Sequence, residues 1–320
     1  MRFFVSTATA ILVALAIAGT SAAPQPSGEA AGRRAARNLL LWRVDGPASA
    51  YLFGTIHVPD ARVLQLPARV DDALAEASAV YTEIPMDLNT RLALTDHVTL
   101  PPHQRLEDIL GTTLHARLLK TFETALSDAP VPDATATALE TMLERLKPWA
   151  ALGQLALLDY LPELAAGRQP LDALLYARAE ADGKRVAGLE TVDEQVAAFD
   201  RFTRAEQVAM LRAALDELDR ARERHTTPAR ALVEAYLDGD LDDLNALLMD
   251  TAADAALARK FQDVMLVSRN RRMAERIGAI RHAEPSTVHF FAVGALHLFG
   301  PNGIPALLCD AGFRVTRLRH

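Results

Sequence analysis

Two copies of the tetrapeptide Gly-x-x-His, near opposite ends of the chain, constrain its fold more than any other feature. The first copy occupies residues 54–57 and the second residues 294–297, and each follows an apolar run that is typical of a buried strand. Glycine permits a sharp turn. A histidine three residues later lies just beyond the strand's carboxyl end, where open α/β sheets bind their ligands. The duplication therefore predicts that His57 and His297 converge on one site.

Strand-like runs alternate with longer segments whose apolar residues recur every three or four positions. The expected strands cover residues 39–44, 50–53, 79–82, 185–189, 288–293 and 313–316, of which the first two form a hairpin. The expected helices cover residues 70–77, 114–126, 134–146, 149–160, 170–181, 191–199, 203–224, 232–237, 241–249 and 252–280. This pattern predicts an α/β fold: a central mixed, mainly parallel sheet surrounded by helices, with a large helical insertion, in a single domain at residues 38–320.

Two glutamates occupy strand ends in the same manner as the histidines. Glu83 follows the third expected strand and Glu190 follows the fourth. Because parallel strands share one carboxyl edge, both acids are expected to lie beside His57 and His297. Neutral imidazoles and carboxylates together suit Mn²⁺, Co²⁺, Zn²⁺ or Fe²⁺. We therefore expect a divalent metal, held by His57, His297 and Glu83, with one position open for water.

Each of these residues also has a plainer interpretation. A strand-end glutamate commonly caps a helix or lies on the surface, and for Glu190, just before an expected helix, that interpretation weighs as much as a site role. Glu83 has no helix to cap because Pro85 follows, which favours the site role. The histidines could be satisfied core imidazoles, but their duplication argues against this. The basic run at residues 269–272 is expected chiefly to be a solvated helix face, although Arg269 could stabilise negative charge at the site.

Composition and missing motifs exclude several functional classes. The formal net charge is −7 and no basic cluster is interleaved with aromatic residues, so nucleic acid is not an expected partner. The sequence contains no His-Glu-x-x-His pair, no Gly-x-Ser-x-Gly elbow and no P-loop. Cys309 is the only cysteine, so an intrachain disulfide is impossible, and its apolar neighbours predict a buried thiol.

The first 23 residues have the features of a secretory signal peptide. Arg2 precedes an apolar centre at residues 11–18, and small residues at 21–23 offer a cleavage site. The apolar stretch is too short for a membrane span. Residues 24–37, rich in Pro, Ala, Gly and Arg, are expected to be a flexible linker. We therefore expect a periplasmic or secreted protein with no stable membrane span after processing.

Four segments of the sequence resemble the TraB/GumN family. They are residues 51–57, 188–191, 269–270 and 294–303, within a resemblance that runs from about residue 41 to residue 318. The family is related to the Tiki proteins and, more remotely, to the erythromycin-esterase and ChaN-like group. The resemblance implies a metal-dependent hydrolase fold, since Tiki relatives act as divalent-metal-dependent proteases on a secreted peptide. Other relatives are linked to pheromone shutdown or exopolysaccharide gene clusters without an assigned reaction.

The family pattern contains two Gly-x-x-His histidines, a glutamate and an arginine. His57 and His297 match the histidines, Glu83 and Arg269 are the best matches for the other two, and Glu190 is a rival acid. The resemblance implies an exported, peptidase-like hydrolase in which Glu83, Glu190 and Arg269 have catalytic roles on a peptide or other small substrate. One glutamate would complete the metal's ligands and the other would act as general base, in either order. The alternative is a non-catalytic periplasmic binding module for a peptide, a glycan or haem.

Overall fold

One mixed sheet organises the computed structural model, which describes residues 39–128, 137–138, 141–249 and 254–319. Its strands are β1 (Leu41–Val44), β2 (Ala50–Thr55), β3 (Ala79–Thr82), β4 (Arg185–Gly188), β5 (His289–Gly294) and β6 (Val315–Arg317). Their order across the sheet is β4-β3-β5-β2-β1-β6. The first four in this order are parallel, whereas β1 runs antiparallel to both β2 and β6. The expected α/β fold, its six strands and the β1–β2 hairpin are confirmed.

The two motif strands, β2 and β5, are direct neighbours in this sheet. Gly54 pairs with Val293 and Thr55 pairs with Gly294, so both strands end at the same level. Every residue of β3 and β5 is buried, as expected for parallel strands that are covered on both faces. Both Gly-x-x-His segments therefore leave the sheet side by side, at its carboxyl edge.

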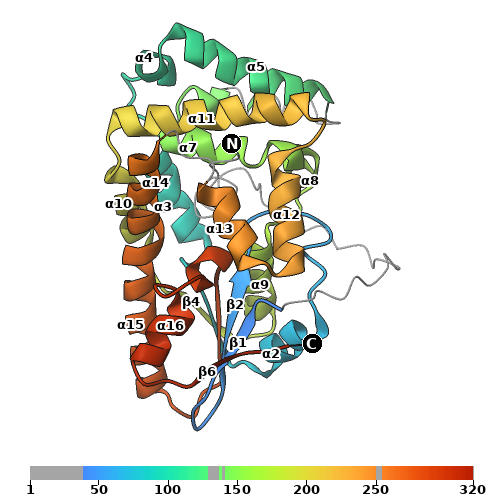
Figure 1. Ribbon diagram of the computed structural model, residues 1–320, viewed down its shortest axis with the longest axis vertical. Helices are drawn as coiled ribbons and strands as arrows, with labels where there is room; N and C mark the ends of the chain where they lie inside the picture. The colour runs from blue at the N-terminus through green and yellow to red at the C-terminus, as the bar shows by residue number, and fades with distance from the viewer. Residues whose placement is uncertain (1–38, 129–136, 139–140, 250–253, 320) are drawn as a thin grey trace.

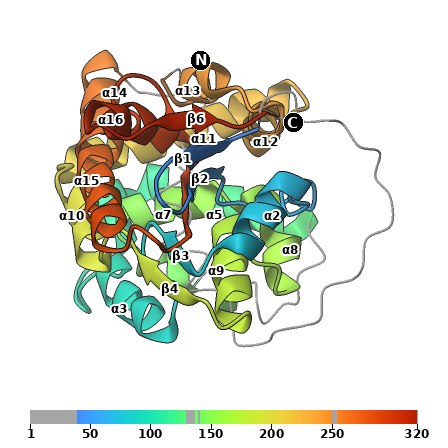
Figure 2. The same ribbon diagram turned by 90° about the horizontal axis from the view of Figure 1, so that it is seen from below.

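Helices cover both faces of the sheet and its carboxyl edge. Figures 1 and 2 show α2 (Ala68–Glu76) and α9 (Leu171–Ala181) on one side, with α15 (Ser268–Ala283) and α16 (Ile304–Asp310) on the other. The remaining α-helices are α3 (Leu88–Val98), α4 (Leu106–Leu110), α5 (Thr112–Asp128), α7 (Pro148–Leu155), α8 (Leu161–Ala165), α10 (Val192–Asp200), α11 (Arg204–Glu223), α12 (Pro228–Asp238), α13 (Leu241–Met249) and α14 (Ala255–Phe261). Three short segments complete the described helical structure: η1 (Leu158–Tyr160), the π-helix η2 (Gln262–Val267) and η3 (Ala295–Leu298).

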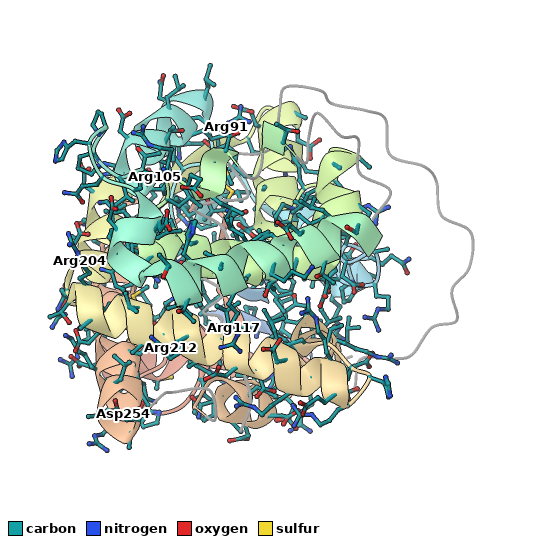
Figure 3. All side chains as sticks on the ribbon, turned by 90° about the horizontal axis from the view of Figure 1, so that it is seen from above. Arg91, Arg105, Arg117, Arg204, Arg212 and Asp254 are labelled. Carbon is teal, nitrogen blue, oxygen red and sulfur yellow. The ribbon has the colours of Figure 1, made fainter. Side chains whose placement is uncertain are left out.

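The helical insertion forms a layer above the carboxyl ends of the parallel strands. In Figure 1, α4, α5, α7 and α11 lie at the top of the molecule, with α12 and α13 between them and the sheet. Arg117 links two helices of this layer, since it extends from α5 and donates hydrogen bonds to Asp216 and Asp219 of α11 (Figure 3). Trp149 of α7, which belongs to this layer, stacks on Phe199 of α10, which does not, and their ring centroids are 4.5 Å apart. The layer is thus joined to the rest of the chain through aromatic packing.

Most expected helices are present, with informative exceptions. The helix expected at residues 252–280 is described as α14, η2 and α15, which follow one another without a break. Helices α3, α4 and α8 were not expected. In α3, Leu88 and Leu92 are 56% and 60% exposed, so its apolar residues do not line a single face. The expected signal peptide and linker, and part of the helix expected at residues 134–146, lie outside the described residues. No helix in the described ranges is long and apolar enough to cross a membrane.

The expectation of a buried Cys309 is wrong, because its side chain is exposed. Helix α16 buries Ile304 and Leu308, which lie four residues apart and so share one face. Cys309 follows Leu308 and is turned about 100° away from that face. The apolar neighbours in sequence belong to the buried side of the helix, and the thiol does not.

Lys184, just before β4, is expected to stabilise the fold through its contacts with the end of α2. Its Nζ donates to the carbonyl oxygens of Leu74, Ala75 and Ala77, which a helix leaves without partners at its carboxyl end. We expect Lys184→Met to lower the free energy of unfolding by about 1–2 kcal/mol. Urea unfolding followed by circular dichroism measures this. Lys120→Met, on α5, is the matched control, and an equal loss in both variants would contradict the expectation.

Candidate functional site

All five side chains expected at the site lie in one buried cluster at the carboxyl edge of the sheet. They are His57, Glu83, Glu190, Arg269 and His297, and none is more than 2% exposed. The cluster centres on one oxygen: Oε1 of Glu83 lies 3.8 Å from Nε2 of His57 and 3.5 Å from Nε2 of His297. The structure therefore brings both motif histidines to the same carboxylate.

His57 is oriented by an acid that sequence analysis did not single out. Its Nδ1 lies 2.7 Å from Oδ1 of Asp172, in the first turn of α9, and Asp172 is itself buried. A carboxylate accepts hydrogen bonds, so the proton of the neutral imidazole is on Nδ1 and Nε2 presents a lone pair. That Nε2 has no hydrogen-bond partner among the described residues. Such an arrangement is typical of a metal-binding histidine whose other ring nitrogen is hydrogen-bonded by an acid that fixes its orientation.

His297 is held in the same tautomer by an amide. Its Nδ1 lies 2.5 Å from Oδ1 of Asn270, and the amide's orientation is fixed because Asn270 Nδ2 donates to the carbonyl of Asn302 at 2.8 Å. Burial lowers the pKa of His297 to about 4, so the ring is neutral at pH 7. Its Nε2 atom lies 3.4 Å from Nη1 of Arg269, which donates a hydrogen bond to it.

Glu83 is ionised although it is fully buried. Burial alone would raise its pKa, but the charge of Arg269 and the neighbouring histidines outweigh that effect and hold the pKa well below its usual range. Oε2 accepts hydrogen bonds from Arg269 at 2.5 Å and from Gln195 at 3.2 Å. Oε1 accepts one from the backbone N–H of Gly294 at 2.7 Å and otherwise faces the two histidines.

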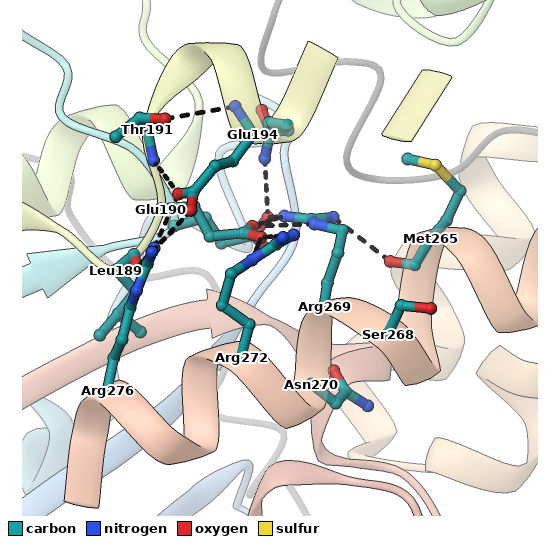
Figure 4. Close-up of polar contacts among 12 residues, drawn as sticks. Leu189, Glu190, Thr191, Glu194, Met265, Ser268, Arg269, Asn270, Arg272 and Arg276 are labelled. Carbon is teal, nitrogen blue, oxygen red and sulfur yellow. Dashed lines mark hydrogen bonds and ion pairs between the residues drawn. The ribbon is translucent and has the colours of Figure 1, made fainter. Parts of the chain in front are cut away.

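Glu190 has both oxygens committed to arginines (Figure 4). Oε2 accepts from Nε and Nη2 of Arg269 at 2.8 and 2.6 Å, and Oε1 accepts from Nε and Nη2 of Arg272 at 3.0 and 2.7 Å. These are paired, charge-assisted contacts of the strong kind. Glu190 is therefore not free to bind a metal or to take up a proton from water.

Arg269 uses every N–H of its guanidinium inside the protein. Besides its bonds to the two glutamates, Nη1 donates to the carbonyl of Met265 at 3.3 Å and approaches His297. Met265 belongs to the π-helix η2, a wide turn of a kind that occurs often at functional sites. The charges of Glu190 and Glu83 outweigh burial and raise the pKa of Arg269 above its usual value. Of its contacts, the one to His297 is the longest.

The expectation that the basic run is a solvated helix face is wrong for most of its arginines. Arg269 is fully buried, Arg272 binds Glu190, and Arg276, one turn further along α15, binds Glu194 and the carbonyl of Leu189 (Figure 4). Glu194 also completes the capping box of α10, for which Thr191 rather than Glu190 is the N-cap. The corner between β4 and α10 packs on α15, and its acids Glu190 and Glu194 neutralise the charges of these arginines.

The absence of a side chain at Gly294 leaves a space between the histidines and Glu83. A Cβ built there would lie 3.1 Å from Glu83 Oε1, 3.4 Å from His57 Nε2 and 3.5 Å from His297 Cδ2. Its backbone angles, φ −52° and ψ 137°, suit any residue. This glycine therefore matters for the space it leaves and not for its conformation.

The donor set fits a divalent cation in chemistry, while the side chains do not already enclose one. Two imidazole nitrogens and one carboxylate oxygen are typical ligands of such ions. Within the described ranges, however, no group of three or more His, Cys, Asp or Glu side chains is arranged so that it could hold a metal ion. Arg269 Nη1 stands beside His297 Nε2 and would have to turn away from a bound ion.

The sequence model of the TraB/PrgY/gumN family matches residues 40–317. The chain belongs to the TraB/PrgY/gumN family. The resemblance noted from the motif residues is thereby confirmed.

Several relatives of this TraB/PrgY/gumN family member carry the name metalloprotease. The chain is 27% identical over 317 residues to "Metalloprotease TIKI homolog" of Amphimedon queenslandica, covering 89% of this chain and 62% of the relative. It is 28% identical over 317 residues to "Metalloprotease TIKI1" of Danio rerio, covering 87% and 63%. An uncharacterized protein of Treponema pallidum (strain Nichols) is 26% identical over 278 residues, covering 83% and 78%. The chain thus spans less than two thirds of the two TIKI relatives' length. No solved structure matches it significantly.

Asp172→Asn is expected to weaken any metal bound through His57. An asparagine amide in place of the carboxylate can donate to Nδ1, which moves the imidazole proton to Nε2 and removes the lone pair that faces Glu83. We expect metal affinity to fall about 10–100-fold with little change in fold. Titration of the metal-free protein with Co²⁺, followed by absorbance, measures this. Asp71→Asn, an exposed acid on α2 that pairs with Arg178, is the control. Equal affinity in the parent and Asp172→Asn would contradict the assigned tautomer.

Proposed function

We propose that this protein is an exported, divalent-metal-dependent hydrolase with peptidase-like activity, whose metal is held by His57, His297 and Glu83. One observation carries the proposal: the Nε2 atoms of both histidines lie within 3.8 Å of the same Glu83 oxygen, beside the space at Gly294. The names of the TIKI relatives support a metal-dependent protease at the level of the family. Export rests on the signal-peptide features of residues 1–23.

The distances within the cluster support a shared ion. Two ligand atoms that each lie about 2.1 Å from one ion in tetrahedral geometry are about 3.4 Å apart. The two Nε2–Oε1 distances, 3.5 and 3.8 Å, are close to that value. Each histidine nitrogen therefore lies at a distance from Glu83 Oε1 that one shared cation would accept.

The formal charges of the cluster are also consistent with a bound cation. Glu83, Glu190 and Asp172 contribute −3 and Arg269 and Arg272 contribute +2, which leaves −1 when both histidines are neutral. An excess of buried negative charge is costly unless it is paired. A divalent cation bound by the two Nε2 atoms and Glu83 would change the net formal charge of the cluster from −1 to +1, so the magnitude of the charge would stay the same.

Each protein group has a role that follows from its contacts. The metal, when bound, would lower the pKa of a water and polarise a substrate carbonyl. Glu83, held at Oε2 by Arg269, would present Oε1 as a ligand. Glu190 would act as a positioning residue for Arg269, because both of its oxygens are committed. This assigns the ligand role to Glu83 rather than Glu190.

Arg269 would supply electrostatic stabilisation through a single N–H group. If His297 Nε2 held a cation, it would no longer accept from Nη1, and that N–H would become available to another acceptor. That N–H could then donate to the oxygen that gains negative charge during hydrolysis. The other four N–H groups bond Glu83, Glu190 and Met265, which limits how far the guanidinium would move when Nη1 turns away from a bound ion.

A non-catalytic binding module is the second candidate, and one contact favours it. Arg269 Nη1 occupies the approach to His297 Nε2 that a metal would need. If that contact persists, the histidines would hydrogen-bond a small ligand, such as a peptide or glycan, or one of them would bind haem iron without turnover.

Metal content distinguishes the two candidates. Protein reconstituted separately with Mn²⁺, Co²⁺, Zn²⁺ and Fe²⁺ would be desalted and analysed by elemental mass spectrometry, beside a His57→Ala/His297→Ala double variant. We expect close to one metal per parent chain and none in the variant, whose fold is checked by circular dichroism. Metal-dependent cleavage of a peptide mixture by the parent completes the test. Equal metal in both proteins, or none in either, together with a Soret band on adding haemin, would support the binding module instead.

A further inference from the structure

A cavity of about 230 Å³ lies between the helical layer and the Gly-x-x-His segments. Its walls come from α7, η1, α11, α12 and α13, of which Figure 1 shows α7, α11, α12 and α13 above β2. His57 and Leu296, the latter beside His297, also line it, and both are buried. We call this cavity the apolar chamber. Its buried end touches the candidate metal site.

The lining of the apolar chamber is mainly aliphatic. Its apolar wall includes Leu155, Leu218, Leu232, Leu244 and Leu247. Glu217 also borders it, but both of its oxygens are bound by Arg220 and Arg224, so its charge is neutralised. The chamber therefore favours an uncharged, apolar occupant.

The other end of the apolar chamber reaches the surface. Asp159, Arg224 and Thr227, which line it there, are exposed. The chamber thus joins a polar rim in water to a buried histidine.

We infer that the apolar chamber is the pocket for a large aliphatic side chain of a peptide substrate, next to the bond that the candidate metal site cleaves. This inference rests on the proposed function for its choice of a peptide. The volume exceeds the roughly 150 Å³ of an apolar cavity that holds benzene, so a leucine or larger side chain fits without rearrangement. Because His57 lines both the chamber and the metal site, a side chain in the chamber places its neighbouring peptide bond close to Glu83.

The expected preference follows from burial of apolar groups. Each methylene moved from water into an apolar pocket contributes roughly fourfold in affinity, and leucine exceeds alanine by three carbons. We expect a peptide with leucine at the position that enters the chamber to bind roughly 50-fold more tightly than the alanine peptide.

The test combines a filling variant with a matched control on the full chain. Ala231 of α12 is half-buried and lines the chamber, so Ala231→Phe fills part of it. Ala246 of α13 is exposed and does not line the chamber, although its neighbour Leu247 does, so Ala246→Phe is the control. If Ala231→Phe does not fold, Ala229→Phe, at another half-buried lining position, replaces it.

The probes are blocked hexapeptides of alanine with leucine or aspartate scanned through each position. Binding is measured by titration calorimetry, and cleavage of the metal-loaded protein is measured by mass spectrometry. We expect a preference for leucine over alanine and aspartate at one position, lost in Ala231→Phe and kept in Ala246→Phe. If calorimetry shows this leucine preference and its loss in Ala231→Phe, but no peptide is cleaved, the pocket is supported and the proposed hydrolase activity is contradicted.

Two outcomes would overturn the inference. The first is metal-dependent cleavage with no preference for leucine, or with a preference that Ala231→Phe leaves unchanged, in which case the hydrolase stands and the pocket does not. The second is binding of octanoate, but of none of the peptides, that Ala231→Phe abolishes. The chamber would then take an acyl chain rather than a peptide side chain.

Discussion

Gly294→Ala is expected to abolish metal retention while the protein stays folded. The added Cβ would occupy the space between Glu83 Oε1 and His57 Nε2, at 3.1 and 3.4 Å from these atoms. The backbone at this position accepts alanine, so the cost in stability should be limited to overpacking, about 1–3 kcal/mol. Elemental mass spectrometry after reconstitution and urea unfolding measure the two effects separately.

Gly278→Ala provides the control for this substitution. Gly278 lies in α15, where an added Cβ would meet only the ring of Phe313, at 3.4 Å. Alanine in a helix interior stabilises by roughly 0.5–1 kcal/mol relative to glycine, so this variant should keep both its fold and its metal. A Gly294→Ala protein that still held one metal per chain would place the metal outside the cluster of His57, His297 and Glu83.

Removing the charge of Arg269 should have the largest effect on stability. Arg269→Met leaves Glu83 and Glu190 buried with one cation fewer, since Arg269 binds both acids directly. Breaking a buried ion pair from one side costs about 3–5 kcal/mol. We therefore expect Arg269→Met to lower the free energy of unfolding by that amount, measured by urea unfolding at pH 7.

Two further variants show whether the loss comes from uncompensated charge. Arg272→Met removes a partner that is 34% exposed, so water can replace it and the loss should be much smaller. Arg269→Met/Glu190→Gln removes one charge of each sign and should recover part of the stability. A double variant no more stable than Arg269→Met would attribute the loss to packing rather than to electrostatics.

The fold was largely predictable because its strands are short, apolar and bounded by turn residues. All six strands were expected within a few residues of their observed positions. Their order was not, since β5 pairs with both β2 and β3 through contacts that no local pattern encodes. The duplicated Gly-x-x-His motif nevertheless indicated that β2 and β5 share an edge, because only then would two histidines meet.

The parts of the site that sequence analysis missed share one property: their neighbours in space are distant in sequence. Asp172 lies in the first turn of a helix, where an acid is common for reasons that have nothing to do with a histidine 115 residues away. The arginines of α15 have the pattern of an exposed face, and only the packing of the β4–α10 corner turns them into partners of Glu190 and Glu194. Asn270 had one signal, its place beside Arg269 in the family resemblance.

The strand order has a consequence for how a nascent chain acquires its shape. The strand between β2 and β3 is β5, which is synthesised after both of them, and β6, the second neighbour of β1, follows later still. Until then, β2 and β3 have open edges and His57 has no counterpart. Long-range pairing of this kind is slow to form. An incomplete chain can therefore form only the β1–β2 and β3–β4 pairs of the native sheet until β5 and β6 have been synthesised.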